Sequence, residues 1–382
     1  MNRIDLREFK TVDNHCHLYL PSKEDQPFER YWNFTFDDFP LEDCKSMLIY
    51  KSAIGEMARL FGIDSIDDEK SVIEKRNEMF KSNPTKYWEM LAEDAKMDKL
   101  IIDTGYPYEP VHGYSITPEE FMDINPTNAQ HINLRIEVYY HQYVEEGLAF
   151  EETVDKTMAD LERDIERYDA VSLKSVAGYF TGLGFEVLEK EEAKKMYYEY
   201  LKDKTNKVAE KGVRDYMLLM GLEICLKHNL PMQIHCGFGN GPIMDLRRSN
   251  PLMLFDIITH PHYGKVKKVI CHCGYPYVAE TGYLASQYKN VWADISAITP
   301  FASIGADSRL VQLFEMAPLN KVMFGTDGHN IPELYWFGTV YFKQRLANVL
   351  DKLVEDNVMS ENYAYNIAER ILSKNAEEFY RL

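Results

Sequence analysis

The sequence predicts an α/β fold, in which eight parallel strands close into a (β/α)8 barrel with a helical insertion after strand 1. Short β-like runs alternate with segments of helical periodicity over 382 residues, and strands separated by helices pair in parallel. A barrel of this kind takes about 250 residues, and more with insertions. The expected strands are Thr11–His15, Lys99–Asp103, Ile132–Tyr139, Ala170–Lys174, Pro231–His235, Lys267–His272, Asn290–Ile295 and Lys321–Gly325.

Apolar residues recur at helical spacing between most of these runs, most clearly in Leu188–His228 and Tyr335–Leu353. The first connection is far longer than the roughly two to six residues of an ordinary βα loop. It contains CKSMLIYKSAIGEMARLFGI and IEKRNEMFKSNPTKYWEMLAEDAKMDKL, which also follow a helical period. We therefore expect one barrel domain over 1–382, with a helical insertion at about 18–98. The insertion forms either a lid or subunit contact at the barrel mouth, or a decoration without a role in substrate binding.

Composition excludes several classes of function. A hydrophobic fraction of 45% supplies a core, and a formal net charge of −18 argues against binding a phosphate backbone, which needs clustered Lys and Arg. The first residues, MNRIDLREFKTVDNHCH, lack the apolar stretch of a signal peptide. No run approaches the roughly 20 apolar residues that span a bilayer. The six cysteines do not resemble a disulfide scaffold, so we expect a reduced, cytoplasmic protein.

Polar residues stand at the C-terminal tips of several apolar runs. Side chains at that end of a parallel strand point towards the mouth of the barrel, where α/β folds carry out their chemistry. Imidazole, amine and carboxylate groups that converge there can bind metal. The residues are His15 and His17 in TVDNHCHL, Lys174 in AVSLKS, His235 in PMQIHC, His272 in KKVICH and Asp327 in KVMFGTD.

Strand alternation tests which of these side chains share a face. Asp13, His15 and His17 point the same way in an extended strand, whereas Asn14 and Cys16 point oppositely. Two imidazoles two residues apart can bind one metal ion, although a single His-x-His also occurs by chance. The same alternation separates His272 from Cys271 and Cys273. We expect both of those cysteines to pack under the surrounding helices as small apolar residues.

Lys174 is the least ordinary member of the set. A lysine on an inward strand face is costly to bury unless it is paired or modified. An amine that has captured carbon dioxide becomes a carbamate, whose two oxygens can bridge two divalent ions. Alternatively, the ammonium group reaches solvent or pairs with a carboxylate. Asp327 ends a strand at a turn flanked by glycine, where a carboxylate either ligates metal or caps the turn.

The order of these residues resembles the amidohydrolase superfamily: His-x-His on strand 1, Lys on strand 4, His on strands 5 and 6, and Asp on strand 8. The resemblance covers essentially the whole chain. The segments LIIDTGY, LKSVAGYFTGL, HCGYPY, TGYLASQYKNVWADIS and ILSKNAEEFYRL look like amidohydrolase-2-type predicted metal-dependent hydrolases of the TIM-barrel fold, relatives of the barrel domain in FluG-like proteins.

The resemblance implies a role for each ligand. His15 and His17 would hold the more buried metal ion together with Asp327, while His235 and His272 would hold a second ion. A carboxylated Lys174 would bridge the two, and Asp327 would also act as general base towards the metal-activated water. His272 is the second expected catalytic residue. The imidazole ligands favour two Zn²⁺ ions over other divalent metals.

The implied activity is metal-dependent hydrolysis of a C–N bond (amide or lactam) or a C–O bond (ester or lactone) in a small polar molecule. The alternative is a mononuclear non-oxidative decarboxylase of a small carboxylic acid. Decarboxylase branches of the superfamily use one metal ion and lack the strand-4 lysine, so the presence of Lys174 favours the two-metal hydrolase. A third hypothesis is a barrel that has lost activity and serves as a binding or assembly module. Since all six candidate ligands are present, the hydrolase is favoured. The family and the large insertion further suggest a homodimer.

Substrate contacts are expected from Arg135, Glu137 and Tyr275. Arg135 and Glu137 share a strand face in INLRIEVYY, where Arg135 either grips a substrate carboxylate or pairs with Glu137 or Asp103. Close relatives tend to read Tyr-Arg after the strand-4 motif, whereas this chain has Tyr179-Phe180, which leaves the recognition of an anionic substrate open. Further candidates for the barrel mouth are Tyr277, Phe238, Asn240, His329 and Glu333.

Overall fold

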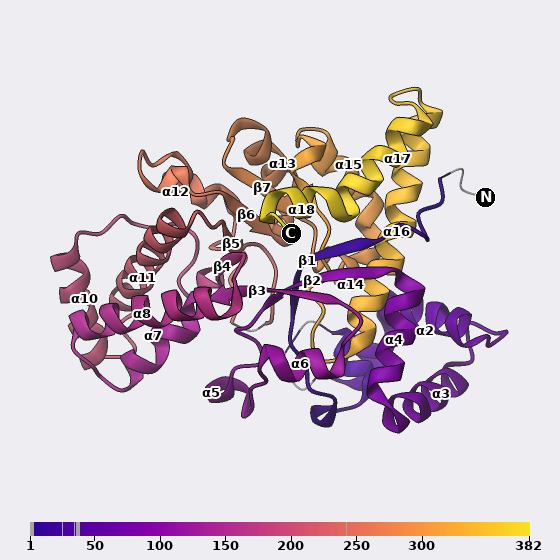
Figure 1. The fold of residues 1–382 in the computed structure, drawn as a ribbon, viewed down its shortest axis with the longest axis horizontal. Coiled ribbons are helices and arrows are strands. Elements are labelled where there is room, and N and C mark those ends of the chain that lie inside the picture. The colour runs from indigo at the N-terminus through magenta and orange to yellow at the C-terminus, as the bar shows by residue number, and fades with distance from the viewer. Residues whose placement is uncertain (1–3, 25, 34, 36–38, 242) are drawn as a thin grey trace.

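The chain folds into a parallel barrel in the computed structural model, which describes residues 4–24, 26–33, 35, 39–241 and 243–382. Within these ranges, eight strands lie in the order β1 to β8, each pairing in parallel with the next (Figure 1). The strands are β1 Thr11–His17, β2 Met97–Asp103, β3 Ala129–Arg135, β4 Ser172–Ser175, β5 Met232–His235, β6 Lys268–Cys271, β7 Val291–Asp294 and β8 Val322–Met323.

Backbone hydrogen bonds between β1 and the segment around β8 close the barrel. Asn14 N–H donates to the Phe324 carbonyl (2.9 Å), Asp327 N–H to the His15 carbonyl (2.8 Å) and His17 N–H to the Gly328 carbonyl (2.8 Å). The predicted (β/α)8 TIM barrel is thereby confirmed.

Each expected strand overlaps an observed one, but the prediction for strand 3 is wrong at its C-terminal end. β3 stops at Arg135, and helix α7 (Ile136–Glu145) begins with the next residue. Ile136, Tyr140 and Tyr143 are all buried, and their spacing is helical rather than alternating. Glu137 therefore lies in the first turn of a helix and shares no strand face with Arg135.

Helices cover the outside of the barrel and connect the strands (Figure 1). The predicted helical segment at 188–228 is two helices, α10 and α11, and the segment at 335–353 lies within α16. The helices that follow β2 are α5 Glu109–His112, α6 Pro118–Ile124, α7, α8 Phe150–Tyr168, α9 Ala177–Phe180, α10 Lys190–Lys202, α11 Lys207–His228, α12 Phe255–Thr259, α13 Val278–Gln287, α14 Ile298–Phe301, α15 Ala306–Phe314, α16 Pro332–Glu355, α17 Glu361–Glu369 and α18 Asn375–Tyr380.

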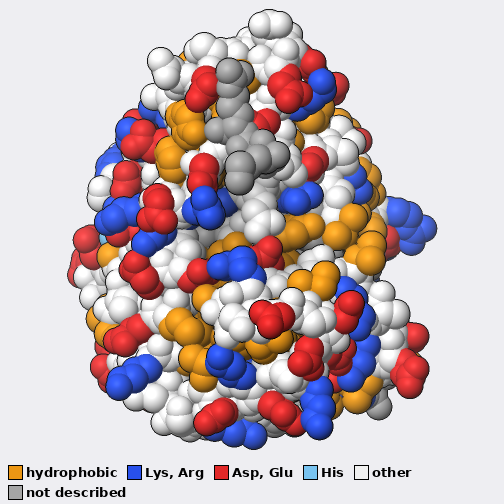
Figure 2. Space-filling model, turned by 90° about the vertical axis from the view of Figure 1, so that its right-hand side faces the viewer, with side chains coloured by type: hydrophobic (Ala, Val, Ile, Leu, Met, Phe, Trp, Pro, Cys, Tyr) orange, Lys and Arg blue, Asp and Glu red, His pale blue; other side chains and the backbone are white. Residues whose placement is uncertain are grey.

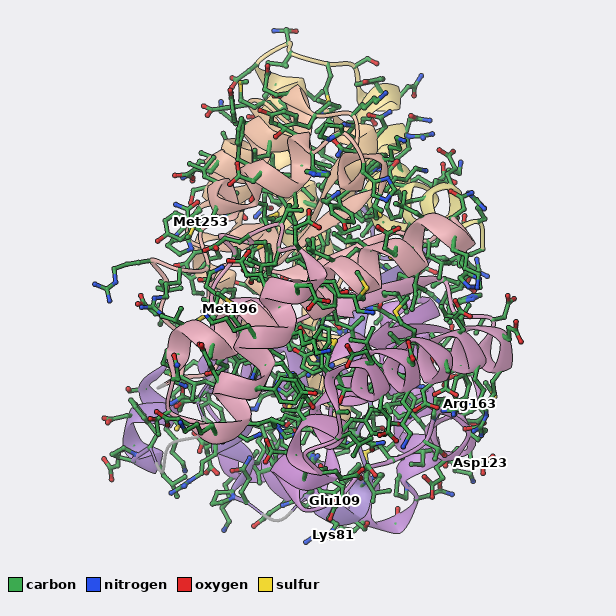
Figure 3. All side chains as sticks on the ribbon, turned by 90° about the vertical axis from the view of Figure 1, so that its left-hand side faces the viewer. Lys81, Glu109, Asp123, Arg163, Met196 and Met253 are labelled. Carbon is green, nitrogen blue, oxygen red and sulfur yellow. The ribbon has the colours of Figure 1, made fainter. Side chains whose placement is uncertain are left out.

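A layer of helices lies on the side of the barrel formed by β3, β4 and β5. Figure 3 looks onto this layer, with Met196 on α10 and Arg163 on α8 labelled. α10 and α11 approach each other closely at Gly212, where an added Cβ would lie 2.0 Å from Met196 Sδ. The long amphipathic helix α11 begins at Asn206, whose side chain accepts from Ala209 N–H and satisfies a free donor at the helix start.

Apolar side chains fill the N-terminal end of the barrel. Val12, Ile101, Val269 and Met323 point inward there, and the C-terminal helix α18 covers them with Phe379 and Tyr380. The Tyr380 hydroxyl reaches further in and donates to Asn14 Oδ1 (2.7 Å). Because this end is packed, a substrate has access from the opposite end of the barrel, where the strands terminate.

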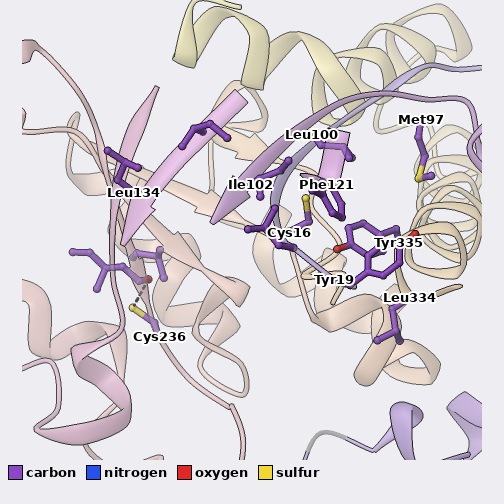
Figure 4. Close-up of a cluster of buried hydrophobic side chains, with 14 of the residues drawn as sticks. Cys16, Tyr19, Met97, Leu100, Ile102, Phe121, Leu134, Cys236, Leu334 and Tyr335 are labelled. Carbon is purple, nitrogen blue, oxygen red and sulfur yellow. Dashed lines mark hydrogen bonds between the residues drawn. The ribbon is translucent and has the colours of Figure 1, made fainter. Parts of the chain in front are cut away.

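Helices also occupy the long first connection. They are α1 Leu41–Ser46, α2 Leu48–Phe61, α3 Glu69–Ser82 and α4 Pro84–Ala95, preceded by the short 3₁₀ turns η1 Pro21–Lys23 and η2 Phe28–Trp32. Of these helices α4 packs against α16, and residues of α2, α3 and α4 share one apolar core with the barrel wall. In that core, Tyr19 from the end of β1 contacts Phe121 and Tyr335, with ring centroids 5.4 and 5.8 Å apart (Figure 4).

A buried ion-pair cluster attaches the insertion to α16. Arg76 on α3 is fully buried and pairs with both Glu24 and Glu333. Its Nη2 donates to Glu24 Oε2 (2.8 Å) and Glu333 Oε2 (3.2 Å), and the Tyr87 hydroxyl donates to Glu333 Oε1 (2.9 Å). The Phe80 ring stacks on the guanidinium at 4.3 Å. Glu333 is thus committed to this cluster, whereas the sequence suggested a position at the barrel mouth.

Two further observations concern the surface. On the face drawn in Figure 2, acidic and basic side chains are interspersed rather than gathered into patches of one sign. Among the described residues, no helix combines the length and the apolar character that crossing a membrane requires.

Arg76 supplies a test of how the insertion is held. Replacing Arg76 with Met leaves Glu333 charged and buried without its partner, so we expect a loss of about 3–5 kcal/mol in the free energy of unfolding. Arg163→Met, which removes a surface cation that is 61% exposed, should cost less than about 1 kcal/mol. Denaturant unfolding followed by circular dichroism measures both. The double variant Arg76→Met/Glu333→Gln should recover part of the loss. Equal stability of Arg76→Met and Arg163→Met would contradict this account.

Candidate metal centre

The six predicted ligands come together at the C-terminal end of the barrel. His15 and His17 lie on β1, Lys174 on β4 and His235 at the end of β5, while His272 directly follows β6 and Asp327 follows β8. All six side chains are buried. Five of them line one cavity of about 220 Å³, and His272 lies immediately behind His235.

Asp327 lies at the centre of the first group of ligands. Its Oδ1 is 3.2 Å from His15 Nε2 and 3.0 Å from His17 Nε2. Burial opposes ionisation of Asp327, but the imidazoles of His272, His15 and His17 hold the pKa of this carboxyl well below its usual range. Burial, assisted by the charge of Lys174, lowers the pKa of His15 to about 4. At neutral pH this group therefore presents a carboxylate beside a neutral imidazole, the forms that bind metal.

His235 and His272 form the second group, and their hydrogen bonds determine where their lone pairs point. The Ser296 hydroxyl donates to Asp294 Oδ2, so Ser296 Oγ accepts from His272 Nδ1–H (2.9 Å). The Phe238 carbonyl, 3.0 Å from His235 Nε2, accepts from that nitrogen. His272 Nε2 and His235 Nδ1 are then both unprotonated, yet they face each other at 3.0 Å. Two lone pairs that converge in this way repel each other unless a cation lies beside them.

Lys174 lies between the two groups. Its side chain is 1% exposed, and Nζ is 3.2 Å from His15 Nε2 and 3.1 Å from Cys271 Sγ. In the described ranges, Lys174 therefore neither reaches solvent nor forms an ion pair with a carboxylate.

The alternation argument for β1 is wrong at Asn14. In the pairing with β2, Asp13 lies opposite Leu100 and Cys16 opposite Ile102, so β1 contains one extra residue at this point. Such a bulge lets consecutive side chains face the same side. His15 faces Lys174 and Asp327, while Asn14 also points inward and donates from Nδ2 to Asp294 Oδ1 (2.6 Å).

The alternation argument also fails at the end of β6. His272 and Cys273 have positive φ angles of 59° and 46°, so the backbone leaves the extended conformation after Cys271. Cys271, two residues after the inward-facing Val269, faces the barrel interior beside Lys174, and the left-handed backbone turns His272 towards the site as well. Cys273 does pack under the helices as expected, in an apolar cluster that includes Val278.

The predicted substrate residues have three different placements. Arg135 lines the cavity and pairs with Asp103, with Nη2 2.7 Å from Asp103 Oδ2, which decides between the partners suggested by the sequence. Glu137 lines the cavity from α7. Its Oε1 accepts from Ser175 Oγ (2.7 Å) and Val176 N–H (2.8 Å). Tyr275 is not among the lining residues, and its ring packs against Phe238, 4.9 Å between centroids.

Of the remaining candidates for the barrel mouth, Asn240 and His329 line the cavity. Phe238 contributes its carbonyl to His235, and the Tyr277 hydroxyl donates to the Leu246 carbonyl (3.1 Å). Neither of these side chains is a lining residue.

Several lining residues were not foreseen. Some follow the end of β2, and the others lie on helices α7 and α11. They are Tyr106, Tyr108, His112, Val138, His141 and Arg214. Asp103 was considered only as an ion-pair partner, but its Oδ2 also lies 3.9 Å from His17 Nδ1. Asp294 lies near the end of the seventh predicted strand, Asn290–Ile295, and Ser296 directly follows it, so their position at a strand tip could have identified these two residues, which orient His272.

Comparison with known proteins shows the family of this chain. The model of the amidohydrolase family matches residues 12–382. The chain belongs to the amidohydrolase family. It is 30% identical to Protein fluG of Emericella nidulans over 224 residues, which are 56% of this chain and 26% of the fungal protein. The chain thus matches only about a quarter of that relative's length.

Solved structures share the fold of this amidohydrolase. A protein of Lactobacillus casei, provisionally described as a metal-dependent hydrolase, superposes with a TM-score of 0.84 at 23% identity, covering 98% of this chain and 96% of its own. Uronate isomerases of Thermotoga maritima and Bacillus halodurans give TM-scores of 0.63 and 0.66 at 13% and 12% identity. Both cover 98% of this chain, and the matches take in 95% and 94% of the isomerases.

Membership in the family implies a metal-dependent enzyme with a divalent ion, and the donor set fits one. The ligand atoms of His15, His272 and Asp327 all lie within 4.8 Å of one another, and those of His15, His17 and Asp103 form a second such group. His15 Nδ1 and His17 Nδ1 are buried without a hydrogen-bond partner. Nitrogen donors with a carboxylate, and lone pairs that converge, are what a divalent ion of intermediate softness requires.

The hydrogen bond from His272 to Ser296 yields a prediction. Ser296→Ala removes the nearer acceptor of His272 Nδ1–H, the hydroxyl at 2.9 Å, and leaves only the Ser296 carbonyl at 3.3 Å to hold the ring. We therefore expect metal affinity to fall by about tenfold. Competition with a chromophoric chelator measures the affinity. Ser286→Ala, which removes an exposed serine hydroxyl on α13, is the matched control and should leave affinity unchanged. If both variants bind metal as the wild type does, Ser296 does not orient a ligand.

Proposed function

We propose that this amidohydrolase uses two Zn²⁺ ions, bridged by a carboxylated Lys174, to hydrolyse a C–N or C–O bond in a small polar molecule. One observation carries the proposal: Lys174 is buried among imidazoles with no carboxylate partner in the described ranges. A lysine ammonium there would be repelled by bound cations, whereas a carbamate supplies two anionic oxygens to them.

The ligands divide as the family pattern suggests. His15, His17 and Asp327 would hold one ion, and His235 with His272 the other. When bound, the ions would lower the pKa of a water molecule and polarise the scissile carbonyl. The likeness to the Lactobacillus casei protein, provisionally described as a metal-dependent hydrolase, is in keeping with this reaction class.

Asp327 is the proposed general base. Its pKa lies well below the usual range, so the carboxylate is ionised at neutral pH. Oδ1 lies within 3.2 Å of two imidazole nitrogens, which leaves Oδ2 to accept the proton from the attacking water. The same oxygen can then return the proton to the leaving group. His272, held in one tautomer by Ser296, contributes a fixed nitrogen donor beside the reaction.

The burial of the site suits this chemistry. Asp327 is 4% exposed and His235 is also 4% exposed, so charges in the site are poorly screened by water. Electrostatic stabilisation of a developing oxyanion is worth more in such surroundings than in water.

Lys174→Met tests the proposal. Without the bridging group we expect metal content to fall from about two ions per chain to one or fewer, as measured by elemental analysis after reconstitution with zinc and bicarbonate. Lys268 provides a matched control. It is also a buried lysine of a barrel strand, but its Nζ donates to the carbonyls of Tyr263 (2.7 Å) and Val266 (3.0 Å), so Lys268→Met should lower stability and retain both ions.

The wild-type measurement separates the hydrolase from its alternative. About two ions per chain, with metal binding that depends on bicarbonate, would send the search for substrates to amides, lactones and esters. One ion per chain after reconstitution, with Lys174 unmodified, would contradict the two-metal hydrolase and favour a mononuclear decarboxylase.

For a substrate found in this way, Asp327→Asn provides a second test. The amide cannot take a proton from water, so we expect kcat to fall by about 10²–10⁴-fold. Asn also remains a neutral oxygen donor of the same shape. Retention of full kcat by this variant would show that another group is the base.

A further inference from the structure

The cavity has a second polar wall, which is formed by helices rather than by strand tips. Glu137, Val138 and His141 line it from the first turns of α7, and Arg214 lines it from α11. None of these residues contacts the six metal-ligand candidates through a hydrogen bond or ion pair recorded in the described ranges.

Glu137 offers an unused acceptor. The side chain is 7% exposed, and both donors that reach it, Ser175 Oγ and Val176 N–H, bond to Oε1. Oε2 is buried and has no hydrogen-bond partner. A buried carboxylate oxygen without a donor is costly, because it has lost its water and gained nothing in exchange. A ligand in the cavity that donates an N–H or O–H to Oε2 would remove that cost.

Arg214 offers a cation to the same part of the cavity. Its guanidinium lies over the Phe180 ring, 4.1 Å from the centroid, and its side chain is 11% exposed. Nε donates to Glu210 Oε1 (3.0 Å) and Nη2 lies 3.0 Å from the same oxygen, but Glu210 Oε2 also accepts from Lys207 Nζ (2.8 Å). One carboxylate is therefore shared between two cations, so Glu210 neutralises the charge of Arg214 only in part.

The two groups lie close enough to act on one ligand. Tyr140 follows Glu137 by three residues on α7, so both are on the same side of the helix. The Tyr140 hydroxyl is 3.4 Å from Arg214 Nη1. The acceptor and the cation thus border one region of a cavity whose volume, about 220 Å³, suits a small molecule.

We infer that Glu137 and Arg214 form the recognition subsite of this cavity, for a substrate that carries a carboxylate and an N–H or O–H donor on the neighbouring carbon. The carboxylate pairs with Arg214, and the donor bonds to Glu137 Oε2. Derivatives of α-hydroxy and α-amino acids have this arrangement. The inference rests on the proposed function, since it describes the substrate of that site.

Glu137→Gln is an unusually clean variant for testing this. The position of Oε1 accepts two hydrogen bonds, so the amide oxygen of Gln must occupy it. The amide NH₂ then takes the place of Oε2 and presents a donor where the wild type presents an acceptor. The fold keeps its contacts, and only the polarity facing the ligand is reversed.

The experiment measures dissociation constants by calorimetry on the metal-loaded protein with three probes. Mandelate has both groups, phenylacetate lacks the hydroxyl and mandelamide lacks the carboxylate. The wild type should bind mandelate at least about tenfold more tightly than either of the others, since hydrogen bonds to charged groups are strong. Glu137→Gln should abolish the preference over phenylacetate. Arg214→Met should weaken mandelate and phenylacetate by about tenfold or more, and leave mandelamide unchanged.

Other results overturn the inference. An α-hydroxy acid can also chelate zinc, but Glu137 is not a proposed ligand, so a preference for mandelate that survives Glu137→Gln unchanged locates that preference at the metal. Equal binding of all three probes by the wild type would show that the cavity recognises neither the carboxylate nor the hydroxyl, and would also overturn the inference. If Arg214→Met does not fold, Arg214→Lys replaces it, and undiminished binding of both carboxylates by the lysine variant counts against a guanidinium contact.

Metal content measured on the same samples keeps the two proposals separate. Two ions per chain without the probe preference would reject the subsite and leave the hydrolase standing. The expected probe preference with one ion per chain and an unmodified Lys174 would support the subsite and reject the two-metal hydrolase.

Discussion

The seam between the last strand and the first is the constraint on which the site depends. The hydrogen bonds from Asp327 N–H to the His15 carbonyl and from His17 N–H to the Gly328 carbonyl close the barrel. They also fix the backbones that carry His15, His17 and Asp327. Nε2 of His15 and Nε2 of His17 are thereby held 3.2 and 3.0 Å from the same oxygen of Asp327. The same hydrogen bonds therefore close the barrel and position the first group of ligands.

The second group depends on hydrogen bonds rather than on closure. Asp294 accepts from the His272 backbone N–H (3.1 Å) and from the Ser296 hydroxyl, and Ser296 in turn accepts from the His272 ring. This chain of contacts positions the ring and fixes its tautomer, so that a lone pair faces His235. Burial raises the pKa of Asp294 to about 6, which still leaves it mostly ionised at neutral pH and able to accept both bonds.

The cavity is lined both by residues at strand tips and by residues of helices from other parts of the chain. The metal-ligand candidates stand on the barrel, while Glu137 and Arg214 stand on α7 and α11. Family relatives are expected to have an arginine after the strand-4 tyrosine, where this chain has Phe180. Arg214 instead places its guanidinium on the Phe180 ring. The cation reaches the cavity from another helix, which links the departure in sequence to the proposed recognition of an anionic group.

The amino-acid pattern alone determined the barrel, the eight strands and the six residues at their tips, because alternating apolar runs and helical periods are local properties. It also singled out Lys174, since an inward lysine needs a partner wherever the strand lies. Only the tertiary structure decided that Asn14 and Cys271 face inward together with His15 and His272, because a bulge and two left-handed residues break the alternation locally. It alone brought Arg214 to Glu137 and Arg76 to Glu333, because contacts between distant helices depend on packing that no short stretch of sequence encodes.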